Sequence, residues 1–127
     1  HETKKDSDES YNAGLSYNIQ HYETIACCNA SHNAESNYLY ANLIMENTIP
    51  KNHPHVNFCQ LYGMSDNITF NLAAAGYNTA KYLPYGPVKE VIPYLIRRAE
   101  ENASVTGDMS RELKLITKEI ERRNERK

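Results

Sequence analysis

The sequence predicts an α/β fold in which about three parallel strands alternate with helices and one further helix follows at the C-terminal end. Three short β-prone runs, at residues 25–30, 56–61 and 77–83, are separated by longer segments whose apolar residues recur every three or four positions. Strands that alternate with helices in this way pair in parallel through right-handed crossovers. This pattern is compatible with an open sheet and with a closed barrel.

The first helix is expected over residues 10–22, because apolar residues recur there at helical spacing and Ser10 can cap it. Residues 1–9 are charged and lack that periodicity, so we expect a loop or a truncated end. The apolar run at 25–30 then reads as a buried strand that stops before Ser31.

The middle of the chain repeats this order. Asn33 is a suitable N-cap for a helix over residues 34–48. Alternating apolar residues predict a strand at 56–61, and Ser65 is the expected cap of a helix over 66–75.

The last strand is expected at residues 77–83, before a turn rich in proline and glycine. Pro87 suits the first position of the next helix, whereas Pro93 lies inside that helix and should bend it. Asp108 or Ser110 is the expected cap of the final helix, which has an apolar seam and a charged end.

One face of the penultimate helix carries a candidate site. At helical spacing Tyr94, Arg97, Arg98 and Glu101 project together. Two neighbouring guanidinium groups beside a tyrosine suit a small carboxylate, which each arginine can bind through two parallel hydrogen bonds. The alternative is a solvated face with an Arg97–Glu101 helix pair worth only about 0.2 to 0.5 kcal/mol.

Further candidate residues follow the predicted strands, where functional residues of parallel α/β proteins gather. Ser31, His32 and Asn33 lie at a strand-to-helix turn, where backbone N–H groups favour an anionic or polyhydroxyl ligand. Leu61 and Tyr82 end the next two strands. The alternative is a packing histidine, a core leucine and a half-buried tyrosine.

The composition narrows the classes of function. With 14 Lys and Arg against 16 Asp and Glu, the formal net charge of −2 offers no broad basic surface for nucleic acid. No apolar run reaches the roughly 18 residues that a membrane span needs, and no signal peptide is visible. The first residue is His1 and not Met, so we expect the sequence to begin inside a longer protein.

The cysteines and histidines predict no metal site. Cys27, Cys28 and Cys59 form an odd set without Cys-x-x-Cys spacing, which favours reduced thiols in a cytosol-like compartment. His53 and His55 could join Cys59 as ligands, but the spacing matches no common zinc pattern.

The segment YLPYGPVKEVIPYLIRRAEEN, residues 82–102, resembles the last barrel strand and following helix of proline dehydrogenase, the flavoenzyme that oxidises L-proline. The resemblance extends upstream through Ala30-Ser31-His32-Asn33 and Gln60-Leu61-Tyr62-Gly63-Met64. It implies that residues 10–127 are the C-terminal part of a single (β/α)8 TIM-type barrel domain. Such a barrel takes roughly 200 to 250 residues, so about half of it is absent from this sequence.

The activity implied by the resemblance is FAD-dependent oxidation of L-proline to 1-pyrroline-5-carboxylate, by hydride transfer to flavin N5, with electrons passed to a quinone. A partial barrel should be inactive alone. The implied location is the bacterial cytoplasm, with peripheral membrane contact of the longer protein left open, or the matrix side of the mitochondrion in a eukaryote.

The resemblance also implies individual roles for the candidate residues. Those implied to bind the cofactor are Ser31, His32, Asn33 and Glu101. Those implied to bind the substrate are Leu61, Tyr82, Tyr94, Arg97 and Arg98. No residue is identified as catalytic, because the family's lysine, aspartate and arginine at the site lie on earlier strands. A different class stays open: a non-catalytic carboxylate-binding or interaction module that uses the same arginines.

Overall fold

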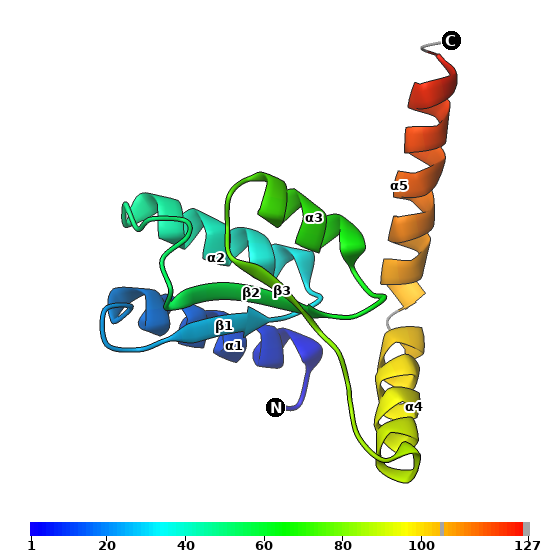
Figure 1. The fold of residues 1–127 in the computed structure, drawn as a ribbon, viewed down its shortest axis with the longest axis horizontal. Helices are drawn as coiled ribbons and strands as arrows, with labels where there is room; N and C mark the ends of the chain where they lie inside the picture. Colours follow the sequence, from blue (N-terminus) through cyan, green and yellow to red (C-terminus); the bar gives the residue numbers. More distant parts are fainter. Residues whose placement is uncertain (105, 126–127) are drawn as a thin grey trace. The chain divides into compact units, whose positions relative to one another are not determined.

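The computed structural model describes residues 1–104 and 106–125, which form two compact units, His1–Leu83 and Pro84–Lys127. The first unit has the element order α1 (Lys4–Gln20), β1 (Cys27–Ala30), α2 (Ala34–Glu46), β2 (Val56–Leu61), α3 (Asp66–Ala74) and β3 (Thr79–Tyr82). The second contains α4 (Val88–Ser104) and α5 (Thr106–Asn124) (Figure 1). The predicted α/β class with three strands alternating with helices is confirmed.

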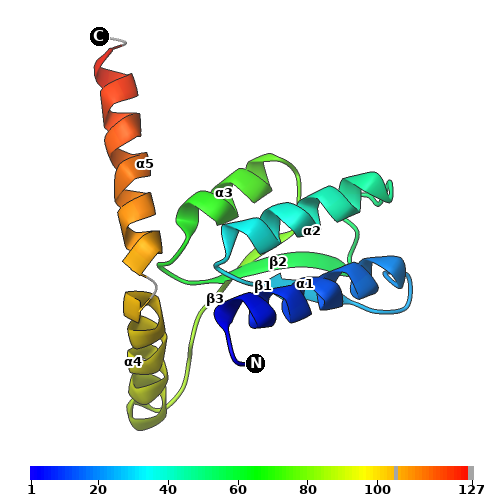
Figure 2. The ribbon, with the colours of Figure 1, turned by 180° about the vertical axis from the view of Figure 1, so that it is seen from behind.

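The strands form one parallel sheet in the order β1-β2-β3. Cys27 pairs with Val56 at one end of the sheet, and Leu61 pairs with Tyr82 at the other. Seen from behind, helices α1, α2 and α3 lie in front of the strands, so they cover the same face of the sheet (Figure 2). Right-handed crossovers place consecutive helices on one face in this way.

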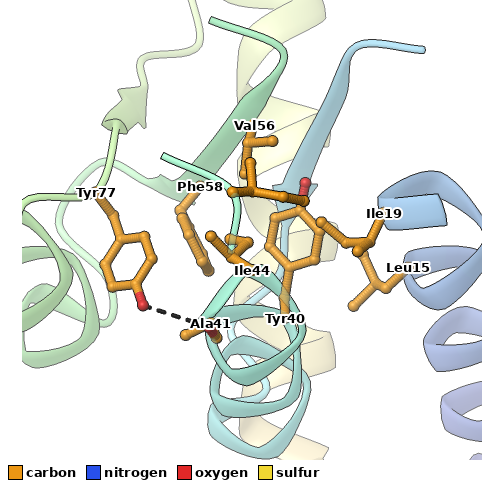
Figure 3. Close-up of a cluster of buried hydrophobic side chains, with 9 residues drawn as sticks. Leu15, Ile19, Tyr40, Ala41, Ile44, Val56, Phe58 and Tyr77 are labelled. Carbon is orange, nitrogen blue, oxygen red and sulfur yellow. Dashed lines mark hydrogen bonds between the residues drawn. The ribbon is translucent and has the colours of Figure 1, made fainter. Parts of the chain in front are cut away.

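The hydrophobic core fills the space between that face and the three helices (Figure 3). At its centre Phe58 of β2 lies between two aromatic rings, with centroid distances of 5.1 Å to Tyr40 and 5.3 Å to Tyr77, both edge-on. The Tyr77 hydroxyl donates to the Ala41 carbonyl at 3.3 Å, which satisfies its polar end inside the core. The remaining buried members are Leu15, Ile19, Ile44, Ile49 and Val56.

The first helix begins earlier than the sequence pattern predicts. Residues 4–9 are helical, so the loop expected over residues 1–9 is wrong there, and Thr3 is the N-cap in place of Ser10. Thr3 and Asp6 form a capping box: the Thr3 hydroxyl accepts from the Asp6 N–H at 3.2 Å, and the Thr3 N–H donates to the Asp6 carboxylate at 3.0 Å. This turn is stabilised by its cap and not by apolar burial, which is why apolar periodicity misses it.

Replacing Thr3 with Ala is expected to lower the free energy of unfolding by about 1 kcal/mol, because the Asp6 N–H in the first turn loses the Thr3 hydroxyl as its acceptor. Urea unfolding of the chain followed by circular dichroism measures this loss. Ser10→Ala is the matched control, since Ser10 is exposed inside the helix and alanine is the better helix former. If Ser10→Ala is the more damaging change, the helix begins at the later residue.

The other boundaries agree with prediction to within a few residues. Strand β2 and the Asn33 cap of α2 are confirmed, the latter by the Glu35 N–H donating to Asn33 Oδ1 at 2.9 Å. The last helix begins at Thr106, so neither Asp108 nor Ser110 caps it. The assignment of residues 10–127 to a single barrel domain stays a prediction.

The second unit consists of two amphipathic helices. Pro93 lies inside α4. Exposed apolar side chains occur on both helices, namely Val88, Ile92, Leu95, Ile96, Leu113, Leu115, Ile116 and Ile120.

Near the end of α5, hydrogen bonds from Arg122 and Arg123 lower the pKa of Glu119 to about 2. In the described parts of the chain, neither these helices nor any other is both long and apolar enough to cross a membrane.

Candidate functional site

The carboxyl ends of the three strands meet at one edge of the sheet, and three predicted site segments lie there. β1 is followed directly by Ser31, while Leu61 ends β2 and Tyr82 ends β3. Leu61 and Tyr82 are register partners, and the Tyr62 N–H donates to the Tyr82 carbonyl at 2.9 Å just beyond them. Leu61 and Tyr82, 21 positions apart in sequence, are therefore neighbours, because parallel strands bring equivalent ends together.

His32 connects the end of β1 to the end of β2 and to the start of α3. Its Nε2 accepts from the Leu61 N–H at 3.4 Å, and its Nδ1 lies 2.9 Å from Ser65 Oγ. Because a backbone N–H can only donate, Nε2 carries no hydrogen, and the neutral ring is protonated at Nδ1 and donates to Ser65. His32 thus has a bridging role within the protein.

Ser65 occupies the N-cap position of α3 as predicted, but its side chain does not cap the helix. The hydroxyl accepts from His32, and the backbone is left-handed, with φ 50° and ψ 41°. A non-glycine residue in that region costs about 1–3 kcal/mol, and such strain is concentrated at functional sites. Since His32 donates to Ser65, it does not act as the base that would activate this serine as a nucleophile.

The turn between β1 and α2, residues 31–33, is held by hydrogen bonds of its own side chains. The Ser31 hydroxyl oxygen accepts from the Asn33 N–H at 3.1 Å, and Asn33 Oδ1 is used in the helix cap. These contacts use acceptor positions of the two side chains and do not involve the Ser31 hydroxyl hydrogen or Asn33 Nδ2. The 13-residue helix α2 begins directly after this turn, and the N–H groups at a helix N-terminus favour anionic or polyhydroxyl ligands.

Sequence reasoning missed the side chains behind this turn. Asn37 of α2 and Gln60 of β2 are 3% and 1% exposed, and both donate to the Ser31 carbonyl, at 2.9 Å and 3.1 Å. A signal was present, because Gln60 continues the inward-facing alternation of Val56 and Phe58. An amide at a core position of a strand requires buried hydrogen-bond partners.

Leu61 and Tyr82, which are predicted to bind the substrate, alternate with the inward-facing residues of their strands and so lie on the other face of the sheet. Leu61 is 9% exposed and Tyr82 is 52% exposed. Next to them Lys81 ties β3 to the β2–α3 connection, since its Nζ donates to the Met64 carbonyl at 2.6 Å and pairs with Asp66 at 2.6 Å. Tyr82 therefore follows a residue whose side chain is anchored to the β2–α3 connection.

In the second unit, α4 places Tyr94 and Arg98 one turn apart, with the Arg98 guanidinium 5.3 Å from the centre of the Tyr94 ring. A guanidinium held over a tyrosine ring loses side-chain freedom. Arg97 is exposed and Arg98 is half-buried. The side chain of Glu101 lies outside the described residues, so its predicted pairing with Arg97 stays a prediction.

The two histidines considered as metal ligands have partners of their own. His53 Nδ1 accepts from the His55 N–H at 3.2 Å, and His55 Nδ1 donates to the Tyr22 carbonyl at 2.9 Å. In the ranges that the structure describes, no three His, Cys, Asp or Glu side chains are grouped to hold a metal ion. The cysteines are unbridged; burial raises the pKa of the Cys28 thiol, and the neighbouring thiols of Cys59 and Cys27 raise it further.

Comparison with known proteins gives a consistent set of relatives. The family model of proline dehydrogenase matches residues 1–111. The chain is 40% identical over 126 residues to proline dehydrogenase 2, mitochondrial, of Arabidopsis thaliana, covering 97% of this chain and 26% of the relative. It is 40% identical over 121 residues to the carbapenem antibiotics biosynthesis protein CarD of Pectobacterium carotovorum subsp. carotovorum, covering 95% and 31%.

A third relative carries a related name. The chain is 46% identical over 94 residues to hydroxyproline dehydrogenase of Xenopus laevis, covering 74% of this chain and 20% of that protein. The chain therefore spans between a fifth and a third of the length of these relatives. No solved structure matches it.

Proposed function

Because this chain belongs to the proline dehydrogenase family, we propose that it supplies part of the flavin and substrate site of an enzyme that oxidises L-proline to 1-pyrroline-5-carboxylate. The observation that carries the proposal is the family match over residues 1–111, which includes the strand-end turn and the arginine pair. Since the chain spans 26% of the Arabidopsis relative, the other walls of the site would come from the rest of the barrel.

On the substrate side, we assign Arg97 and Arg98 to the proline carboxylate. Two planar guanidinium groups can each donate two parallel hydrogen bonds, and contact of Arg98 with the Tyr94 ring limits its motion. Leu61 and Tyr82, which are register partners, would pack against the pyrrolidine ring. These residues act by orientation, which can supply much of the rate enhancement of an enzyme.

On the cofactor side, we assign Ser31, His32, Asn33 and Glu101 to FAD. The flavin would supply the hydride-accepting chemistry when bound. Ser31 and Asn33 would donate to its polar oxygens, and His32 would hold this turn against β2 and α3 through Leu61 and Ser65.

Electron transfer to a quinone and the location of the enzyme are part of the same proposal. The Arabidopsis relative is named mitochondrial. We therefore propose the matrix side of the mitochondrion if the source is a eukaryote and the cytoplasm if it is a bacterium, with peripheral contact between the longer protein and the quinone-bearing membrane.

Replacing His32 with Ala, in the protein expressed from its complete reading frame, is expected to weaken FAD binding about tenfold, the low end of the range for groups that orient a ligand-binding residue. The reason is the loss of its hydrogen bonds to Leu61 and Ser65. Two quantities are measured: the flavin absorbance per protein after purification, and the apparent affinity for proline of the flavin-loaded fraction.

His21→Ala is the control, because His21 is an exposed histidine of the same unit, with its ring 4.5 Å from the Tyr17 ring and tilted against it. It should retain its flavin. Full flavin occupancy with weakened proline binding in His32→Ala would place His32 on the substrate side, through its contact with Leu61.

A further inference from the structure

A continuous network of buried side-chain amides lies beneath the strand-end turn. Its three amide members, Asn29, Asn37 and Gln60, are 0%, 3% and 1% exposed and come from β1, α2 and β2. Tyr11 of α1 and Thr69 of α3 close its two ends by donating to Asn29 Oδ1 at 2.7 Å and to Gln60 Oε1 at 2.8 Å. Burial raises the pKa of Tyr11, which keeps its hydroxyl protonated as a donor.

The contacts allow only one orientation of the two amides nearest the turn. Asn37 Nδ2 donates to the carbonyls of Ser31 at 2.9 Å and Asn33 at 2.8 Å, and carbonyl oxygens can only accept. Its Oδ1 therefore faces the other way and accepts from Asn29 Nδ2 at 3.1 Å and from Gln60 Nε2 at 3.3 Å. All four hydrogen-bonding positions of the Asn37 amide are filled.

Gln60 is oriented by the same argument. Its Nε2 donates to the Ser31 carbonyl at 3.1 Å, so its Oε1 faces Thr69. The Ser31 carbonyl thus accepts from two amide groups that are anchored in a helix and in the central strand. A carbonyl held from two directions restricts the peptide plane to which it belongs, and that plane also carries the His32 N–H.

We propose that Asn37 and Gln60 are positioning residues for FAD, which hold the Ser31 carbonyl so that residues 31–33 present their donors in one fixed arrangement. The inference rests on the proposed function, because it takes the turn as the flavin contact. Neither amide needs to touch the cofactor. In metal sites, removing a group that holds a ligand residue from behind typically changes affinity about 10- to 100-fold, and we expect an effect of the same order here.

The test uses the protein expressed from its complete reading frame and compares two substitutions in one network. Gln60→Met keeps the length of the side chain and removes its donors to Ser31. Thr69→Val is the matched control, since it removes a buried hydrogen bond from the far side of Gln60 and leaves the Ser31 contacts in place. The measured quantities are the FAD dissociation rate, the kcat and proline KM of the flavin-loaded fraction, and the unfolding midpoint.

Gln60→Met should accelerate FAD dissociation about 10- to 100-fold, with the kcat and KM of the loaded fraction within about twofold of the unsubstituted protein. Thr69→Val should lower the unfolding midpoint and leave the dissociation rate unchanged. Equal acceleration in both variants, or none in Gln60→Met, overturns the inference, because the amides would then serve stability alone.

Gln60→Glu provides a second test, which remains possible if the Gln60→Met variant folds poorly. The charged carboxylate cannot donate to the Ser31 carbonyl, but the protonated acid can. The FAD retention of this variant, divided by that of the unsubstituted protein, should therefore rise as the pH falls. If this ratio does not change with pH, the inference is contradicted. If the unsubstituted protein binds no flavin at any pH, the proposed function itself fails.

Discussion

The 127-residue chain expressed by itself is expected not to oxidise L-proline. Its sheet has the order β1-β2-β3, and no further strand pairs with β1 or β3 within the described residues. An eight-stranded barrel takes roughly 200 to 250 residues, so the other walls of a flavin and proline site cannot come from this chain. Two unpaired strand edges also present N–H and C=O groups to other molecules, and such edges promote association.

This expectation is tested by purifying the chain and measuring flavin absorbance, size in solution and dye reduction with proline. We expect weak FAD binding, self-association and no dye reduction above a proline-free control. A yellow monomer that reduces the dye with proline would contradict the barrel interpretation. A chain that binds proline without flavin would favour the alternative of a non-catalytic carboxylate-binding module.

Replacing Arg97 or Arg98 with Met, in the protein expressed from its complete reading frame, should lower kcat/KM for proline about ten- to a hundredfold. Each substitution removes charge-assisted hydrogen bonds to the proline carboxylate, each worth about 1.5 to 3 kcal/mol, and keeps most of the apolar stem. Flavin content should stay unchanged. Arg98→Met should have the larger effect, because contact with the Tyr94 ring orders this guanidinium before substrate arrives.

The matched control is Arg122→Met, since Arg122 is an exposed arginine of the same unit that pairs with Glu119. Its kinetics should be those of the unsubstituted protein. Unchanged proline kinetics in both Arg97→Met and Arg98→Met would refute the carboxylate assignment. Loss of flavin together with activity would show that these arginines belong to the cofactor side.

Much of the first unit could be predicted from the sequence because its signals are local. The Val56–Leu61 strand follows from apolar alternation. Asn33 caps α2 by accepting from the N–H of Glu35, two residues further along the chain. The first turn of α1 could not be predicted from apolar periodicity, because it depends on the capping box between Thr3 and Asp6. That signal is also local, but it is a polar one.

The candidate site was predicted less completely, because its side chains are arranged by tertiary contacts. Ser65 reads as an ordinary helix cap until the structure shows that its hydroxyl accepts from His32, 33 positions away in sequence. Neither Gln60 nor Asn37 was predicted as a site residue, because the contact that joins them, a shared bond to the Ser31 carbonyl, is tertiary. Sequence spacing places residues on a strand or a helix, but it does not show which of two partners a polar side chain will choose.

The strand order β1-β2-β3 also has a consequence for biosynthesis. Each strand pairs with the strand that precedes it in the chain, so no contact of the sheet has to wait for a distant segment. The connections between neighbouring strands, residues 31–55 and 62–78, are complete before the next strand is made, and chains emerge from the ribosome at about 5–20 residues per second. Each β-strand and helix can therefore dock on the previous pair during translation. The sheet and the strand-end turn would then be assembled before the helix that carries the arginines is made.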